Sequence, residues 1–232
     1  MERFIYNLVK SNPRFKNILR NIYQDLISLF DFKNRAFVKG NLITKEGFFF
    51  GFHDIKPFSY DDSKLLANKI YVNLKMPNSK DKLGVGYFDA ELKSYSEFDR
   101  TSSWNWHKGC RLQWLNNYKI IYNYKINQKI ISKIFDIKSK KFEFINYPID
   151  TISKKFQLAS SFNYDRLELL MPGYGYRQHL KKDLEDLNKN PDDDGLFVVN
   201  LQTKKRELYI SLKQLSQTWE HKYSNDKYHF VT

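Results

Sequence analysis

A repeated turn motif is the strongest constraint on the fold of this chain of 232 residues. Phe88-Asp89, Phe135-Asp136 and Val199-Asn200 each end an apolar run with Asp or Asn and lead through a polar turn into another run. Asp89 and Asp136 are 47 residues apart, whereas Asp136 and Asn200 are 64 apart. The charged stretch at residues 178–194, which resembles an inserted helix, accounts for the additional 17 residues. A period of 40 to 50 residues therefore organises the chain after about residue 45.

Each repeat contains four short runs rich in β-branched and aromatic residues, which are typical of strands. The second repeat has runs at 110–114, 119–124, 130–136 and 141–145, and Asn116-Asn117 and Asn127-Gln128 are typical of hairpin turns. Four antiparallel strands at this spacing predict an all-β fold, a WD40-like β-propeller of four-stranded blades. We expect blades at 48–99, 104–147 and 152–212, an insertion at 178–194, and the start of another blade at 223–232.

An open ring follows from this count of blades. Propellers close with about 4 to 8 blades, so three blades and the start of a fourth leave a blade face exposed at each end. We expect this chain to be the N-terminal part of a longer protein, or to close its ring by self-association.

The first 44 residues form a separate helical segment in this prediction. Apolar residues recur at helical spacing over 13–31, and Asn12 followed by Pro13 supplies an N-cap and a first helical position. The polar face carries Arg14, Lys16 and Arg20, so contact with an anionic membrane is an alternative. We favour packing of this helix against the rest of the fold.

Composition excludes several classes of protein. Hydrophobic residues make up 41% and aromatic residues 17%, which is more than a disordered chain carries. The net charge of +13 comes mainly from lysine, whereas phosphate recognition usually recruits arginine, so nucleic-acid binding ranks last. A single cysteine, Cys110, excludes a disulfide framework and a Cys-based zinc site. With no secretory signal or long apolar run in the sequence, we expect a cytoplasmic protein.

Four motifs suggest a relationship to known propellers: residues 51–58 (GFHDIKPF), 104–114 (WNWHKGCRLQW), 172–176 (PGYGY) and 191–195 (PDDDG). They resemble a group of bacterial propeller proteins, similar to oligogalacturonate lyase and TolB-type propellers, that are often associated with surface-polysaccharide genes. The resemblance covers residues 45–232. In lyases of this kind a divalent metal is held by His and Gln side chains near the ring centre, and acidic sugars are cleaved by β-elimination. Most of those ligand positions would lie in blades beyond this chain.

Three histidines are the candidate metal ligands. His53 and His107 precede or begin the first strand of a repeat, and His229 lies at the corresponding place in the next one. These imidazoles would bind a divalent metal or a carboxylate-bearing sugar. The alternative is that His53 and its neighbour Asp54 tie a loop to the blade.

Arg111 and one glycine-rich loop are the candidate substrate-binding groups. The Arg111 guanidinium suits a carboxylate, but capping of carbonyl groups between blades is an equal alternative. The loop at 172–177 has two glycines and would present Tyr174, Tyr176 and Arg177 to a ligand. Trp104, Trp106 and Trp114 are expected to pack between blades.

The function predicted from these residues is the binding or processing of an acidic glycan or sugar intermediate in surface-polysaccharide metabolism. The alternative is a non-catalytic scaffold for protein partners. The sequence holds no Gly-x-Ser-x-Gly elbow and no His-Glu-x-x-His pair, so a conventional hydrolase is not supported. Whether the protein is an enzyme stays open at this point.

Overall fold

The computed structural model describes residues 22–23, 25–26, 40, 42–127, 129–155, 157–180, 183–218 and 229–231. The chain divides into two compact units, Met1–Thr44 and Lys45–Thr232. In the first unit, the four described residues of the expected helix (Ile22, Tyr23, Asp25 and Leu26) are helical and exposed. The rest of the helix expected at 13–31 lies outside the described residues.

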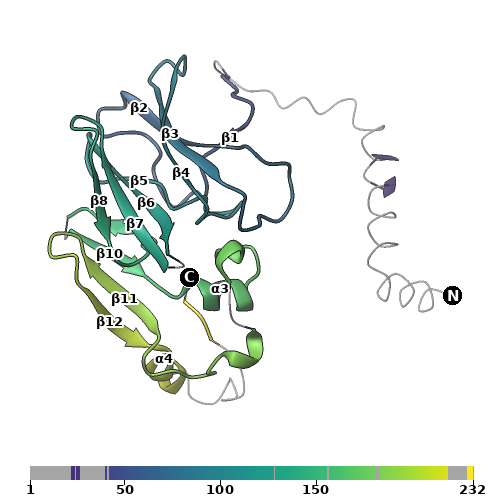
Figure 1. The fold of residues 1–232 in the computed structure, drawn as a ribbon, viewed down its shortest axis with the longest axis vertical. Helices are drawn as coiled ribbons and strands as arrows, with labels where there is room; N and C mark the ends of the chain where they lie inside the picture. The colour runs from purple at the N-terminus through teal and green to yellow at the C-terminus, as the bar shows by residue number, and fades with distance from the viewer. Residues whose placement is uncertain are drawn as a thin grey trace. The chain divides into compact units, whose positions relative to one another are not determined.

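The second unit is mostly β, and its strands form three four-stranded antiparallel sheets (Figure 1). Sheet 1 has the order β1(Phe48–Phe49), β2(Lys64–Lys69), β3(Leu83–Asp89), β4(Tyr95–Thr101). Sheet 2 has the order β5(Gln113–Trp114), β6(Lys119–Ile126), β7(Lys129–Asp136), β8(Phe142–Ile145). Sheet 3 contains β9(Ile152–Ser153), β10(Leu158–Ser161), β11(Gly195–Asn200) and β12(Arg206–Ser211), with β12 and β9 at its edges. The prediction of an all-β fold built from four-stranded antiparallel sheets is confirmed.

The repeated turn motif has a physical cause that the structure makes explicit. The Oδ1 atom of Asp136 accepts hydrogen bonds from the N–H groups of residues 138 and 139, and Asn200 does the same with residues 202 and 203. Both turns then place a lysine in the left-handed region, Lys140 at φ 57° and Lys204 at φ 58°. Asp and Asn are favoured here because their short side chains bond to the backbone of the turn. Asp89 accepts from Lys93 and Ser94 in a related turn.

Sheet 2 lies between the other two and packs against both of them. On β6, Ile120 and Tyr122 belong to a core that contains Leu66 and Val85 of sheet 1. Ile121 lies between them in sequence and belongs to a second core with Val199 of sheet 3. Because successive side chains of a strand point to opposite faces, a strand buried on both faces reads as a continuous apolar run.

The insertion in the third repeat is longer than predicted and differs in structure. Residues 162–194 connect β10 to β11 and contain α3(Tyr164–Leu170), η1(Arg177–His179) and η2(Leu184–Asp186). The prediction of one inserted helix at 178–194 is therefore wrong, since α3 lies before that range and the described part of the range holds only 3-10 turns. Asn163 caps α3 by accepting from the N–H groups of residues 165 and 166. A helix of seven residues is too short to show a clear helical period.

The C-terminal region follows a second short helix, α4(Leu212–Thr218). The strand predicted at 223–232 lies largely outside the described residues, and the three that are described, His229–Val231, are not in a strand. Among the helices of the described part of the chain, none has the length and apolar character needed to cross a membrane.

Candidate functional site

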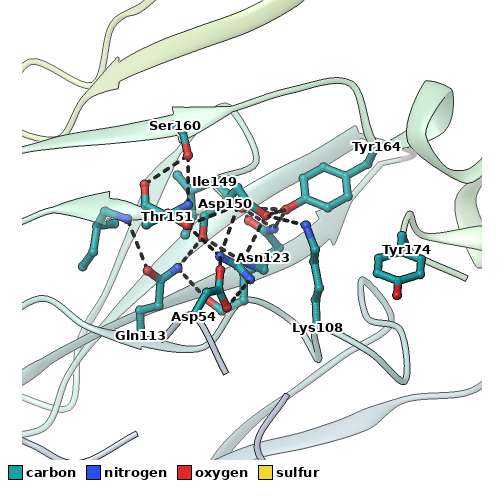
Figure 2. Close-up of polar contacts among 12 residues, drawn as sticks. Asp54, Lys108, Gln113, Asn123, Ile149, Asp150, Thr151, Ser160, Tyr164 and Tyr174 are labelled. Atoms are coloured by element: carbon teal, nitrogen blue, oxygen red, sulfur yellow. Dashed lines mark hydrogen bonds and ion pairs between the residues drawn. The ribbon is translucent and has the colours of Figure 1, made fainter. Parts of the chain in front are cut away.

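A buried polar cluster that includes Asp54, Gln113 and Asp150 brings together segments next to the three sheets (Figure 2). These segments are linked by Arg111. Its guanidinium donates to both carboxylate oxygens of Asp54, with N–O distances of 3.2 and 2.8 Å. It also donates to the Asp150 carbonyl oxygen at 2.8 Å and to the Thr151 hydroxyl at 2.8 Å. The Lys108 ammonium lies 3.5 Å from Asp150 Oδ1. One arginine from the segment before β5 thus links the connection between β1 and β2 of sheet 1 with the segment that leads into β9 of sheet 3.

Burial decides what Arg111 does. Its side chain is 0% exposed, and its donors are directed to groups of this chain. Although burial acts in the opposite direction, the Arg111 guanidinium lowers the pKa of Asp54 below its usual value. Arg111 was predicted as a carboxylate-binding group for a ligand, but here it binds the protein's own carboxylates and a carbonyl group. This arrangement is closer to the alternative, in which the arginine caps carbonyl groups between repeats, than to a ligand-binding role.

Tyr176, predicted as a ligand-contacting residue, is also buried. Its ring stacks on that of Tyr164, with centroids 4.3 Å apart and an interplanar angle of 4°. Its hydroxyl accepts a hydrogen bond of 2.7 Å from the Asn123 side-chain amide. Asn123 is itself buried and also donates to the Ile149 carbonyl oxygen. Tyr176 therefore anchors the glycine-rich loop in the core and cannot be presented to a ligand from the surface.

The structure brings two of the predicted site residues, His107 and Arg177, together in what we call the aromatic hollow, which is also lined by Met76, Trp106 and Glu168 among others. The His107 ring stacks on Tyr174 at a centroid distance of 4.3 Å. Arg177 is exposed at the rim, and burial raises the pKa of Glu168 above its usual value. The hollow has a volume of about 30 Å³, which is the share of a single water molecule in the liquid. It admits one functional group of a ligand rather than a sugar ring.

The three histidines predicted as metal ligands do not form a site together. His53 is exposed beside Phe52, His107 stacks on Tyr174, and the carbonyl oxygen of His229 accepts from Arg166. All three belong to the described residues, and within those residues no group of three or more His, Cys, Asp or Glu side chains could hold a metal ion. The described residues therefore provide no metal site of this kind, and we derive no chemistry from one.

A much larger cavity, which we call the intersheet cavity, lies where sheets 2 and 3 meet the connection between β10 and β11. Its volume is about 590 Å³. It is lined by residues 129–130, 146–148, 162–166, 186–188, 191, 193–194, 197 and 206. Volumes of this size are typical of pockets for small organic ligands.

Arg206 is the most informative residue of the intersheet cavity. Its guanidinium carbon lies 4.4 Å from the ring centroid of Tyr147 and 4.0 Å from that of Phe197. Burial lowers the pKa of Arg206 below its usual value, although Tyr147 and Asp194 act in the opposite direction. Within the described part of the chain, the guanidinium forms no hydrogen bond or ion pair. An arginine held in this way presents N–H donors to a ligand.

The intersheet cavity also offers hydrogen-bond acceptors. Asp193 and Asp194 line it, together with Asp165 and Asp186. The Asp194 carboxylate accepts from the Asn163 side chain at 2.9 Å and from the N–H of Gly195 at 2.8 Å. Lys129 lies 5.4 Å from the Tyr147 ring centroid. Donors and acceptors therefore line the same open cavity as an aromatic ring.

Sequence reasoning did not find this cavity. Its lining comes from eight separate stretches of the chain, and none of them contains a recognisable binding motif. One signal was present in the sequence, because two of the lining carboxylates belong to the acidic run Asp192–Asp194, which by sequence alone is interpreted as a solvated turn.

Comparisons with known proteins add little to this site. No family model matches the sequence, and no curated protein matches it. Among solved structures, the apo form of the AtxE2 isopeptidase is similar over 75% of this chain, with 9% sequence identity and a TM-score of 0.40. The match covers 31% of that chain, so this chain spans about a third of the length of that structure. A TM-score at this level establishes no shared function.

Proposed function

We propose that the three sheets are blades of a β-propeller and that the protein binds an acidic saccharide in the intersheet cavity. The propeller is supported by the repeated four-stranded sheets, their consecutive packing and their shared turn motif. The saccharide is supported by the composition of the cavity wall, and one observation carries this part of the proposal.

That observation is the position of Arg206 between two aromatic rings, at the wall of a cavity of about 590 Å³. A guanidinium is planar and matches a carboxylate through two parallel hydrogen bonds. Because the rings hold its plane, little side-chain freedom would be lost when a carboxylate binds. Arg206 would therefore bind the acidic group of the sugar, with Lys129 as a second cation nearby.

The rest of the cavity suits a polyhydroxylated ring. Carboxylates such as Asp193 and Asp194 accept hydrogen bonds from hydroxyl groups. The four aspartates in the lining would repel the closely spaced negative charges of a polyphosphate. A ligand with one carboxylate for each ring and several hydroxyl groups satisfies both requirements, which favours an acidic saccharide over a polyphosphate.

Calorimetric titration with oligogalacturonate and with neutral galactose oligomers tests the proposal. We expect binding of the acidic oligomer, and about a tenfold or greater loss of affinity in Arg206→Gln, since truncation of a charge-assisted hydrogen bond costs about 1.5–3 kcal/mol. Arg100→Gln is the matched control, because Arg100 also lies over a tyrosine ring, Tyr71 at 4.2 Å, but is paired with Glu97. Equal affinity for the two oligomers, or an unchanged affinity in Arg206→Gln, would refute it.

A further inference from the structure

The first turns of the three sheets meet in a second concave surface, which we call the turn groove. Tyr60 comes from the turn before β2, residues 115–118 join β5 to β6, and Lys154 and Gln157 come from the turn between β9 and β10. The groove has a volume of about 520 Å³. It shares no lining residue with the intersheet cavity.

Hydrogen bonds between sheets hold the turn groove in shape. The N–H of Tyr60 donates to the Asn117 side-chain oxygen at 2.9 Å. Asn116 braces its own turn by accepting from the N–H groups of Tyr118 and Lys119, both at 2.8 Å. The wall is therefore organised before a ligand binds, which lowers the entropic cost of binding.

The charge of the turn groove is one-sided. None of the described residues that line it is acidic. The Lys154 ammonium lies 3.9 Å from the Tyr60 ring centroid. Lys138 does not line the groove itself, but its ammonium lies 3.4 Å from the ring centroid of the lining residue Tyr118. Neither lysine forms an ion pair within the described part of the chain. Each ammonium thus rests against an aromatic ring and could turn towards an incoming carboxylate.

From this arrangement we propose that the turn groove docks an acidic peptide segment of a partner protein. Tyr60 and Tyr118 are 51% and 45% exposed, and exposed tyrosines are enriched in protein interfaces. An extended peptide can contact both tyrosine rings and Leu115, and its acidic side chains can reach Lys138 and Lys154. The side-chain amides of Asn116 and Asn117 suit its main-chain groups.

Fluorescence anisotropy of the full chain with a short labelled peptide of alternating Glu and Leu tests this proposal. We expect saturable binding that weakens at least about tenfold in the double variant Lys138→Glu/Lys154→Glu. The matched control is Lys45→Glu/Lys80→Glu, which makes the same change in net charge at two exposed lysines outside the groove. Arg206→Gln should leave the affinity for the peptide unchanged, which separates this proposal from the one for the intersheet cavity.

Three comparisons decide whether the occupant is a peptide. The same peptide with Gln in place of Glu should bind at least about tenfold more weakly. Tighter binding of oligogalacturonate, or of a single-stranded oligonucleotide, that is lost in the Lys138→Glu/Lys154→Glu variant would overturn the assignment to a peptide. Equal loss of peptide binding in the Lys45→Glu/Lys80→Glu control would show that binding depends only on the net charge of the protein. That result would also overturn the proposal.

Discussion

The Arg111 guanidinium binds both carboxylate oxygens of Asp54, a residue 57 positions earlier in the sequence. The same side chain donates to the Asp150 carbonyl oxygen, 39 positions later. Asp54 lies in the connection between β1 and β2 of sheet 1, Arg111 lies just before β5 of sheet 2, and Asp150 lies just before β9 of sheet 3. One fully buried arginine therefore ties three repeats together, and its loss should affect the whole second unit.

Replacement of this arginine should be strongly destabilising. In Arg111→Met, the Asp150 side chain, 9% exposed, would lose a charged partner in the interior. Removal of one member of a buried ion pair costs about 3–5 kcal/mol, and we expect a decrease of this size in the free energy of unfolding, measured by urea denaturation. Arg100→Met, at an exposed pair with Glu97, should cost less than about 1 kcal/mol. Similar values for the two variants would contradict the structural role of Arg111.

Local chemistry explains why the repeat could be predicted. The turns at Asp136 and Asn200 need a side chain that accepts from two backbone N–H groups, and this need recurs once for each sheet. Strands such as β6 are buried on both faces, and they appear in the sequence as apolar runs. Both signals arise from residues that are close together in the chain, so both can be recognised from the sequence alone.

The functional residues could not be predicted in the same way because their roles depend on distant partners. Arg111 and Tyr176 are residue types that often bind sugars, but the partners that bury them, Asp54 and Asn123, lie more than 50 residues away. Two residues separate α3 from β10, and the seven residues of this helix are too few to show a helical period of apolar residues. Arg206 faces the intersheet cavity only because sheets 2 and 3 pack together.

Stability should fall on mild acidification because of His179. This side chain is 5% exposed, its Nε2 atom lies 3.1 Å from the Ser103 hydroxyl, and burial lowers its pKa from 6.5 to about 4. The unfolded chain therefore binds a proton near pH 6.5, whereas the folded chain resists protonation until about pH 4. Stability is complete above pH 6.5 and is lost progressively as the pH falls towards 4, by up to ~3 kcal/mol.

Urea denaturation at several pH values checks this expectation. In His179→Gln the decrease in the free energy of unfolding between pH 6.5 and pH 4 should become smaller, because glutamine does not titrate in this range. Below pH 4 both proteins should lose stability as carboxylates such as Asp54, whose pKa is lowered in the folded state, become protonated. An identical slope in the two proteins between pH 6.5 and 4 would assign the effect to other groups.

Gly175 should not tolerate a side chain. A Cβ atom at this position would lie 2.3 Å from the Tyr164 carbonyl oxygen and 2.6 Å from the Glu168 nitrogen, both main-chain atoms of α3. Gly175→Ala would therefore push the loop away from α3, at a cost of about 1–3 kcal/mol. Since Tyr174 precedes it in the loop, the stack with His107 should loosen. The NMR shifts of the His107 ring protons report this change directly, and unchanged shifts would show that the loop is not held by this contact.

The aromatic hollow and the intersheet cavity give opposite predictions for saccharide binding. If the sequence-based assignment is right, Tyr174→Ala and Arg177→Ala should weaken the binding of oligogalacturonate. If the cavity is the site, both variants should keep their affinity within about twofold, whereas Arg206→Gln should lose about tenfold or more. We expect the second result, because the hollow has a volume of about 30 Å³ and the cavity one of about 590 Å³.

Arg177 is exposed, so Arg177→Ala should leave the fold intact, and a change in affinity would then report on the binding site alone. Loss of affinity in Arg177→Ala together with normal affinity in Arg206→Gln would move the binding site to the aromatic hollow.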